Sequence, residues 1–211
     1  MSGALLGVVI AGGRSTRYGE PKALVEVGGH RVVDRVAHAL RSVVAADDVV
    51  VIANDSVLGD AIGLPFRGDL LEDAGAVAGV HAGLVWARER GQRGIIAAAC
   101  DMPFLSVALL REIIARAGAA DAVVPESTGP RGVEPLCAYY GIGCITAIEA
   151  AAARGDARMI GFHADVRVER IPLAVVRSCG DVEVMFRNLN TPADRADAER
   201  LLPEGQDDAE R

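Results

Sequence analysis

The sequence predicts an α/β fold in which helices cover both faces of a mostly parallel sheet. Several apolar runs of Val, Ile and Ala lack polar alternation, which is typical of strands inside a parallel sheet. Stretches with helical spacing separate these runs along the chain, as right-handed crossover connections require. A length of 211 residues suits one domain of this kind with a sizeable core.

The first elements follow this alternation. Residues 5–10 form an apolar run that stops at a glycine pair, and the apolar positions of residues 32–44 recur with helical spacing. A second buried strand is expected over residues 49–53. Residues 60–69 are expected to be irregular, and residues 70–71 to form a short strand.

The central part continues with a helix, a strand and another helix. Small residues crowd the start of an amphipathic helix that ends near Arg90, and residues 95–100 form another buried run. Ser106 is suited to cap a helix over residues 107–117, because its hydroxyl can accept from a backbone N–H group. A short strand is expected at residues 122–125.

The last part adds two strands and two helices. A strand at residues 136–140 precedes a helix over residues 142–154. Residues 166–171 at first alternate apolar and charged side chains, which favours an edge strand. Thr191 as cap and Pro192 at the first helical position start a last helix.

These elements predict one three-layer, Rossmann-like domain over residues 1–202, with a disordered acidic tail over residues 203–211. A net charge of −7 and an aromatic content of 4% argue against a nucleic-acid partner. No apolar run is long enough to cross a membrane, and the first residues do not resemble a signal peptide. The cysteines lack C-x-x-C spacing and fit small buried residues of a reduced cytoplasmic protein: Cys100, Cys137, Cys144 and Cys179.

The first strand opens onto a loop that combines glycines with cations. Gly12 and Gly13 lack side chains, so their backbone N–H groups can approach a phosphate closely. Arg14, Arg17 and Lys22 follow and supply the opposite charge. An ordinary strand–turn–helix corner with solvated basic residues is the alternative. Three cations so close together in an acidic chain favour a nucleotide site.

Two carboxylates follow strands at the same predicted edge of the sheet. Asp101 ends the run A-A-A-C-D-M-P, and Asp73 precedes the helix with the small-residue start. Ligands bind at the carboxyl edge of open parallel sheets. A role in capping a turn would also explain Asp101. We favour a Mg²⁺ ligand, because Mg²⁺ in proteins is often held by few carboxylates together with water and substrate phosphates.

Other nucleotide-binding and catalytic motifs are absent from the sequence. There is no G-x-x-x-x-G-K-[ST] sequence, and residues 12–17 do not match G-x-G-x-x-G. No histidine, serine and acidic residue are spaced as in a hydrolase. His81 lies in the small-residue turn, where ligand contact is one interpretation and a structural role is the favoured one.

Five motifs carry a resemblance to a known family. The loop V-I-A-G-G-R-S-T-R-Y-G-E-P-K-A-L is the first, and G-A-V-A-G-V-H-A-G-L and C-D-M-P-F follow it. E-P-L-C-A-Y-Y and N-L-N-T-P-A-D complete the set in the same order. This combination resembles the molybdenum cofactor guanylyltransferases, a family of the nucleotidyltransferase superfamily. The A-G-G form of the loop is similar to that of relatives that use GTP, whereas A-A-G is typical of relatives that use CTP.

The resemblance implies a role for each matching residue. The implied nucleotide-binding residues are Ile10, Ala11, Gly12, Gly13, Arg14, Lys22, Asp73, Gly79 and Asp101, and the implied catalytic residues are Lys22, Arg17 and Asp101. Asp73 would accept from guanine N1–H and the N2 amino group, and Asp101 would hold Mg²⁺. Asn188, Asn190 and Arg158 would lie on the side of the second substrate.

The implied reaction transfers GMP from GTP to the phosphate of a molybdopterin-type acceptor. Because the attacking phosphate is already ionised, positioning and charge neutralisation suffice and no general base is required. The resemblance also implies molybdoenzyme maturation proteins as partners. The chain departs from the family pattern at Tyr18, Pro21 and Ala76.

Three alternatives stay open on the sequence. The first is a related nucleotidyltransferase that uses CTP or acts on a sugar or polyol phosphate. The second is a nucleotide-binding protein without catalysis, against which the presence of Lys22 and Asp101 speaks. The third is a dinucleotide-binding domain, which needs an acidic residue after the second strand and a glycine pattern; Asn54–Asp55 follows that strand, but the glycine pattern is absent.

Overall fold

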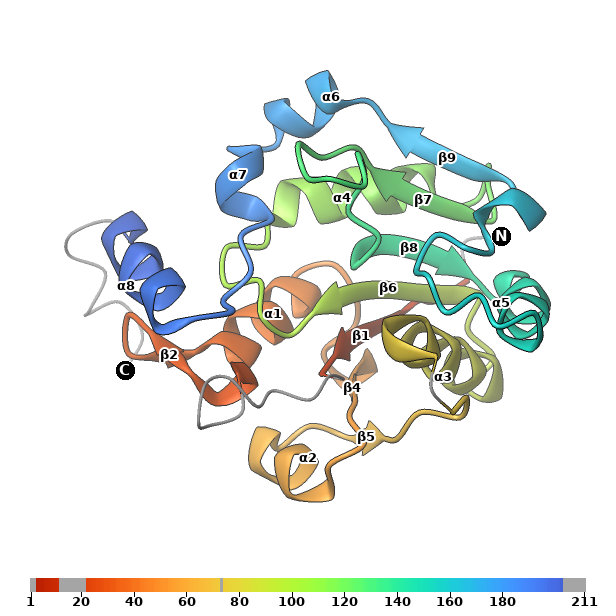
Figure 1. The fold of residues 1–211 in the computed structure, drawn as a ribbon, viewed down its shortest axis with the longest axis horizontal. Helices are drawn as coiled ribbons and strands as arrows, with labels where there is room; N and C mark the ends of the chain where they lie inside the picture. Colours follow the sequence, from red (N-terminus) through yellow and green to blue (C-terminus); the bar gives the residue numbers. More distant parts are fainter. Residues whose placement is uncertain (1–2, 12–21, 73, 203–211) are drawn as a thin grey trace.

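The computed structural model describes residues 3–11, 22–72 and 74–202. Its centre is a seven-stranded sheet in the order β5-β4-β1-β6-β8-β7-β9 (Figure 1). The strands are β1 (Leu6–Ile10), β4 (Val49–Ile52), β5 (Phe66–Arg67), β6 (Gly94–Ala99), β7 (Ala122–Pro125), β8 (Cys137–Gly141) and β9 (Val168–Ile171). The predicted α/β fold with a mostly parallel sheet is confirmed.

The direction of the strands decides which ends share an edge. β1 pairs in parallel with β4 on one side and β6 on the other, and β4 pairs in parallel with β5. β8 runs antiparallel to both β6 and β7, whereas β9 is parallel to β7 and forms the expected edge strand. The carboxyl ends of β1, β4 and β6 therefore lie at one edge together with the start of β8.

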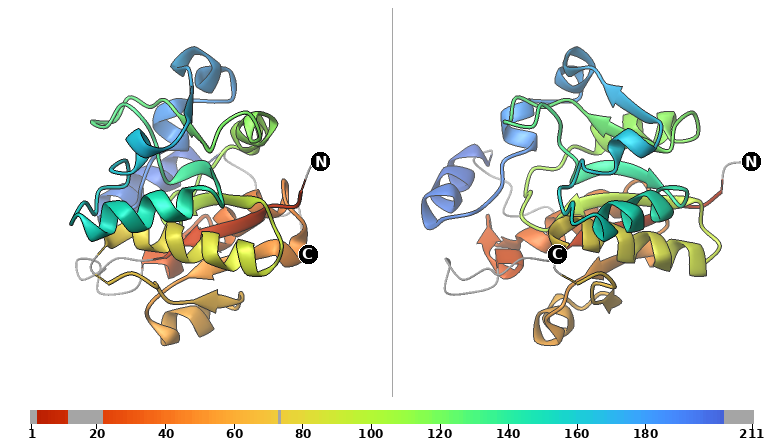
Figure 2. Two further views of the ribbon diagram at one scale, coloured as in Figure 1. Left: turned by 90° about the vertical axis from the view of Figure 1, so that its right-hand side faces the viewer. Right: turned by 45° about the vertical axis from the view of Figure 1, so that its right-hand side comes forward.

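Helices cover both faces of the sheet, which gives three layers (Figure 2). On one face lie α1 (Val32–Arg41) and α4 (Val107–Arg116), and on the other lie α3 (Gly75–Glu89) and α5 (Cys144–Ala153). No helix in the part of the chain that the structure describes has the length and apolar character needed to cross a bilayer.

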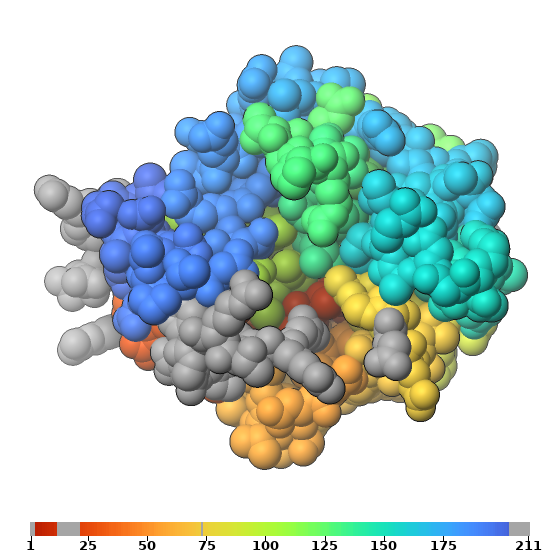
Figure 3. All heavy atoms as spheres, in the orientation of Figure 1, coloured from red at the N-terminus to blue at the C-terminus, as the bar shows by residue number. Residues whose placement is uncertain are grey.

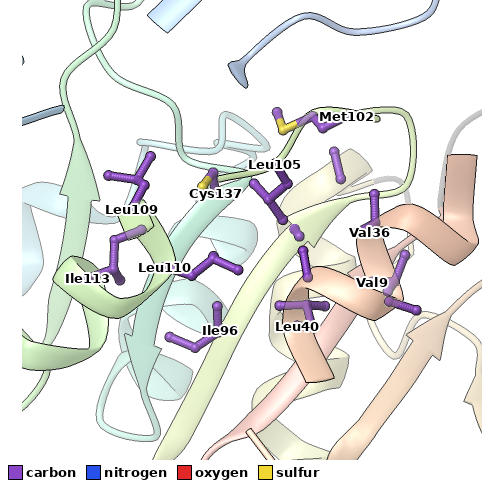
Figure 4. Close-up of a cluster of buried hydrophobic side chains, with 14 of the residues drawn as sticks. Val9, Val36, Leu40, Ile96, Met102, Leu105, Leu109, Leu110, Ile113 and Cys137 are labelled. Atoms are coloured by element: carbon purple, nitrogen blue, oxygen red, sulfur yellow. The ribbon is translucent and has the colours of Figure 1, made fainter. Parts of the chain in front are cut away.

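The core on the α1 and α4 face shows why the strand runs are apolar throughout. Leu40 from α1 and Leu110 from α4 point toward Val9 and Ile96 of the sheet (Figure 4). Each of these four side chains is fully buried. The next residues of β1 and β6 face the α3 and α5 layer instead, so both faces of these strands need apolar side chains.

A smaller cluster joins two segments from opposite ends of the chain. Its first side is the two-stranded ribbon of β2 (Glu26–Val27) and β3 (His30–Arg31), which follows a 3-10 turn at Lys22–Leu24. Its second side is α8 (Pro192–Leu201), which lies beside the ribbon (Figure 1). Leu189 is fully buried in this cluster.

The cap of α8 is the predicted one. The Thr191 hydroxyl accepts from the Asp194 backbone N–H, and the Asp194 carboxylate accepts from the Thr191 N–H, which forms a capping box. Pro192 occupies the first turn as expected. Ser106 likewise caps α4, because its hydroxyl accepts from the Leu109 N–H.

The prediction for residues 54–71 is wrong in part. The expected strand at residues 70–71 is absent, and β5 lies instead at Phe66–Arg67, where the Ala53 N–H donates to the Arg67 carbonyl. Helix α2 (Ser56–Ile62) begins where we expected only the end of a strand. The Asp55 carboxylate caps α2, and Gly63 ends it in the left-handed conformation that favours glycine.

Three further elements have no counterpart in the sequence prediction: the β2–β3 ribbon, α6 (Leu173–Ser178) and α7 (Val182–Met185). The described cysteines are all free thiols, two buried and two half-buried. The tail expected at residues 203–211 lies outside the described residues, and the domain limits stay a prediction.

We predict that Gly94→Ala destabilises the fold and that Gly143→Ala does not. A Cβ atom at Gly94 would overlap the Tyr140 carbonyl oxygen and lie 2.9 Å from the Gly141 Cα, both on the paired strand. The expected loss in unfolding free energy is about 1–3 kcal/mol, as for other overpacked sites. A Cβ atom at Gly143 meets nothing within 4 Å, and its helical backbone suits alanine. Urea denaturation of both variants measures the difference, and equal stability would contradict the prediction.

Candidate active site

The ends of three parallel strands bring backbone and side chains to one edge. The Cys100 N–H donates to the Ile10 carbonyl at 3.1 Å, and the Ala11 N–H donates to the Ile52 carbonyl at 2.9 Å. Asp101 follows directly, so its carboxylate lies next to the point where β1 stops. Figure 3 shows the molecule hollowed at this edge, between the start of α3, the β7–β8 connection and the C-terminal segment.

Two hydrogen bonds connect the C-terminal segment to this edge. The Lys22 Nζ donates to the Asn190 Oδ1 at 2.6 Å, across 168 positions of sequence. The neighbouring Leu189 N–H donates to the Asp101 carbonyl at 3.0 Å. Three predicted site residues from separate sequence motifs therefore lie together: Lys22, Asp101 and Asn190.

The carboxyl group of Asp101 is held in a partly dehydrated position. Burial raises its pKa, and the nearby Lys22 ammonium offsets part of that rise. The adjacent Cys100 thiol has its pKa raised to about 12, first by burial and then by the negative charge of Asp101. The thiol is therefore protonated at neutral pH and is not a nucleophile of this site.

A second carboxylate, which the sequence analysis missed, lies near the Gly79 turn of α3. The Asp69 Oδ2 accepts from the Asn54 side-chain amide at 2.7 Å, and the Asp69 N–H donates to the Asn54 Oδ1 at 2.6 Å. A Cβ atom at Gly79 would lie 3.7 Å from the Asp69 Oδ1 and 3.0 Å from the Ile10 Cγ2. The missing side chain of Gly79 thus allows α3 to pack closely against Ile10, and the Asp69 carboxylate lies near this contact.

Glu134 is a third carboxylate at this edge and was also missed. The antiparallel register of β6 with β8 continues beyond the strands, because the Ala99 N–H donates to the Leu136 carbonyl. This register directs Glu134 toward Asp101. Burial is the main cause of the raised pKa of Glu134, and the charge of Asp101 adds to the rise to a smaller extent. The Glu134 Oε1 accepts from the Leu136 N–H. The E-P-L-C-A-Y-Y motif contained this residue, but no spacing rule connects it to C-D-M-P-F.

The second-substrate residues are placed in different ways. The Asn188 Oδ1 is buried and finds no hydrogen-bond partner among the described residues. Arg158 is exposed and pairs with Asp156 in the turn after α5, and no hydrogen bond or ion pair within the described segments joins it to Lys22, Asp101 or Asn190. The role of Arg158 toward an acceptor stays a prediction.

Several predicted residues lie outside the described residues: Gly12, Gly13, Arg14, Arg17 and Asp73. His81 is described and takes the structural role that we favoured. It is 4% exposed, and its Nε2 lies 3.1 Å from the Glu149 Oε1 in the contact between α3 and α5.

The donor set around Asp101 suits a hard cation with few protein ligands. Asp101 offers carboxylate oxygens, and Asn188, which precedes the Leu189 that donates to the Asp101 carbonyl, carries an amide oxygen without a hydrogen-bond partner among the described residues. Within residues 3–11, 22–72 and 74–202, no group of three or more His, Cys, Asp or Glu side chains could enclose a metal ion. An ion held here would need water and substrate oxygens, as Mg²⁺ commonly does.

A lysine and a strand-end carboxylate together at the carboxyl edge of a doubly wound sheet are typical of nucleotide-handling α/β proteins. The chain belongs to the MobA-like NTP transferase domain family, whose members are nucleotidyltransferases, and residues 7–168 match that family.

Two curated relatives match almost the whole chain. One is the probable molybdenum cofactor guanylyltransferase of Pelotomaculum thermopropionicum, which is 36% identical over 198 residues, 94% of this chain and 93% of the relative. The other is the molybdenum cofactor guanylyltransferase of Desulfosudis oleivorans, which is 34% identical and covers 96% of this chain and 98% of its own length.

A solved structure supports the fold. Molybdopterin-guanine dinucleotide biosynthesis protein A from Archaeoglobus fulgidus superimposes with a TM-score of 0.73 at 24% identity, covering 93% of this chain and 97% of its own. The family named from the sequence motifs is confirmed.

We predict that Asp101→Asn raises the thermal stability of the protein at neutral pH. The raised pKa means that the folded state disfavours the ionised carboxylate, and asparagine removes that charge. As the pH falls through the raised pKa, the wild-type carboxyl takes up a proton and the stability difference should shrink. Melting curves of both proteins between pH 8 and about pH 4 test this, since the unperturbed pKa is about 3.9. A constant difference across that range would contradict it.

Proposed function

We propose that this chain transfers GMP from GTP to the phosphate of a molybdopterin acceptor and releases pyrophosphate. The observation that carries the proposal is the identity of more than a third of the residues, along nearly the whole chain, with a curated guanylyltransferase of the molybdenum cofactor. The relatives do not favour the alternatives of CTP, a sugar phosphate or a protein without catalysis.

The nucleotide half of the site would lie at the end of β1. Ile10 and Ala11 would lie beside the nucleotide at the strand end, where Gly79 packs closely against Ile10. Lys22 would bind the triphosphate with the donors that it does not use on Asn190. We keep the predicted phosphate roles of four residues outside the described part: Gly12, Gly13, Arg14 and Arg17.

We infer that Asp69 contributes to guanine recognition. Its carboxylate lies near Gly79, where it accepts from the Asn54 side-chain amide, and the Asp69 N–H donates back to the Asn54 Oδ1, which fixes the orientation of the residue. A carboxylate can accept from N1–H and the N2 amino group of guanine together, which cytosine cannot offer. Asp73 stays the residue that the sequence motif predicts for this role.

Members of this family generally depend on a divalent metal, and we propose that the ion is Mg²⁺ held by Asp101. The bound ion would neutralise charge on the phosphates as the bond at the α-phosphorus forms and breaks. The nearby Lys22 adds a fixed positive charge from the protein itself. Asp101 is already dehydrated, so a cation gains more from it than from a solvated carboxylate.

The chemical step needs alignment rather than a base. An oxygen of the acceptor phosphate forms a bond to the α-phosphorus of GTP, and the bond from that phosphorus to the bridging oxygen of pyrophosphate breaks. The attacking oxygen is ionised at neutral pH and carries no proton to remove. The protein has to bind, orient and neutralise the reacting groups, as in other phosphoryl-type transfers.

The acceptor would approach from the side of β8 and the C-terminal segment. We propose Asn188, Asn190 and Arg158 for this side, and the unpartnered Asn188 Oδ1 supports the proposal for Asn188. Maturation proteins of molybdoenzymes would receive the product, and we propose that the protein works in the cytoplasm.

A nucleotide panel tests the proposed activity. The purified protein with Mg²⁺ and each of GTP, CTP, ATP and UTP, with and without molybdopterin, is assayed for pyrophosphate release. We expect release with GTP only, and only when molybdopterin is present. Release with CTP while GTP is inert would reject the proposal, and release without molybdopterin would reject the acceptor.

We predict that Lys22→Ala lowers turnover by about a hundredfold to a thousandfold, the range for removing one preorganised electrostatic group. Lys22 is the only lysine among the 211 residues, so amine-directed labelling of the internal chain reports on this position alone, and GTP should protect it. The control is Arg88→Ala, which removes an exposed cation at the end of α3. Near wild-type turnover of Lys22→Ala would exclude the lysine from catalysis.

A further inference from the structure

The contact between Lys22 and Asn190 poses a question of electrostatics. Lys22 lies close enough to Asp101 for its charge to lower the pKa of that carboxyl. An ammonium and a carboxylate in a partly dehydrated site attract each other strongly. Yet no ion pair within 4.0 Å joins Lys22 to Asp101, and among the described residues Lys22 donates only to a neutral amide oxygen, that of Asn190.

The backbone at Asn190 is fixed on both sides, which places its side-chain amide at the lysine. Before it in the chain, Leu189 is fully buried and its N–H donates to the Asp101 carbonyl. The Asn190 N–H itself donates to the Asp194 carboxylate at 2.8 Å, within the capping box of α8. The same helix is bound to the β2–β3 ribbon, where the Gly28 N–H donates to the Glu199 Oε2 at 3.0 Å.

We propose that Asn190 is a positioning residue that holds the Lys22 ammonium apart from the Asp101 carboxylate before the nucleotide binds. A direct pair would neutralise both charges, and the incoming phosphates and metal would have to break it. The amide oxygen satisfies one donor of the ammonium without cancelling its charge. Lys22 then keeps a full positive charge for phosphate, and Asp101 keeps its carboxylate for a cation.

This inference rests on the proposed binding of GTP and assigns to Asn190 a role on the nucleotide side of the site. The α8 segment, which lies beyond the residues that match the family, would thus set the geometry of the phosphate site. Figure 1 shows α8 beside the β2–β3 ribbon, which follows Lys22 in the chain.

The first test is GTP affinity without divalent metal, measured by calorimetry in EDTA for the full-length protein. We expect Asn190→Ala to weaken binding by about tenfold, as for the loss of a hydrogen bond to a charged group. Asn190→Asp is nearly isosteric and should weaken binding more, because a carboxylate would neutralise the lysine. Arg200→Ala is the matched control, since it removes an exposed side chain of α8 that pairs with Asp197 alone among the described residues, and it should leave GTP affinity unchanged.

A double-mutant cycle shows whether Asn190 acts through the lysine. In the Lys22→Ala background, Asn190→Ala should have no further effect on GTP affinity. An equal loss in both backgrounds would overturn the proposal, and so would wild-type affinity in Asn190→Ala or Asn190→Asp. Failure of the wild-type protein to bind GTP even with Mg²⁺ present would instead reject the proposed function, so the two failures are distinguishable.

A second measurement does not depend on the nucleotide. Because the chain has a single lysine, labelling with ¹³C-lysine gives one side-chain signal for Lys22. In the Asn190→Ala background the signal should respond to Asp101→Asn much more strongly than in the wild-type background, because the two groups would then be paired. An unchanged response would contradict the proposal, and melting curves check that each variant is folded.

Discussion

The parallel pairing of β1 with β4 and β6 is the constraint on which the rest of the structure depends. Parallel strands deliver their carboxyl ends to one edge, and the chain must leave that edge by loops. The two backbone hydrogen bonds that end the pairing, from Cys100 to Ile10 and from Ala11 to Ile52, place Asp101 beside the first strand. The backbone of the sheet therefore sets the position of the site.

The charges at this edge are arranged at the expense of stability. Burial raises the pKa values of the Asp101 and Glu134 carboxyl groups. The charge of Asp101 also raises the pKa values of Glu134 and Cys100. A fold selected for stability alone would place amides or apolar groups here. Carboxylates and a lysine that form no ion pair with one another within the described part of the chain are typical of a site that binds charged ligands.

The sequence predicts what depends on local pattern. β1, β4 and β6 are recognisable because both of their faces are buried, and the caps Ser106 and Thr191 because a hydroxyl there binds its own helix. β5 is not predicted because two residues are too few to show a strand period. α2 is not predicted because its seven residues, which include a glycine, show too little of the helical period. These elements depend on tertiary pairing, which a local window does not contain.

The same division holds for the site. Asp101 is recognisable as a carboxylate that ends a buried strand, and Lys22 as a cation after a glycine turn. Asp69 has no such pattern in the sequence, since its position results from the reciprocal bonds with Asn54 and from the close packing of Gly79 nearby. The bond from Lys22 to Asn190 crosses 168 positions, and only the folded chain makes it visible.

The reversal of direction at β8 divides the edge into two halves with different capacities for change. On the nucleotide half, β1, β4 and β6 are joined through α1 and α3, so a change in their connections disturbs the core. On the other half, β7 and β8 are joined by a surface loop that starts and ends at the same edge. Loops of this kind tolerate insertion and substitution. Substitutions and insertions in this loop can therefore change the side proposed for the second substrate without disturbing the strands proposed to bind the nucleotide. The same fold can then accept different acceptors while it keeps its nucleotide donor.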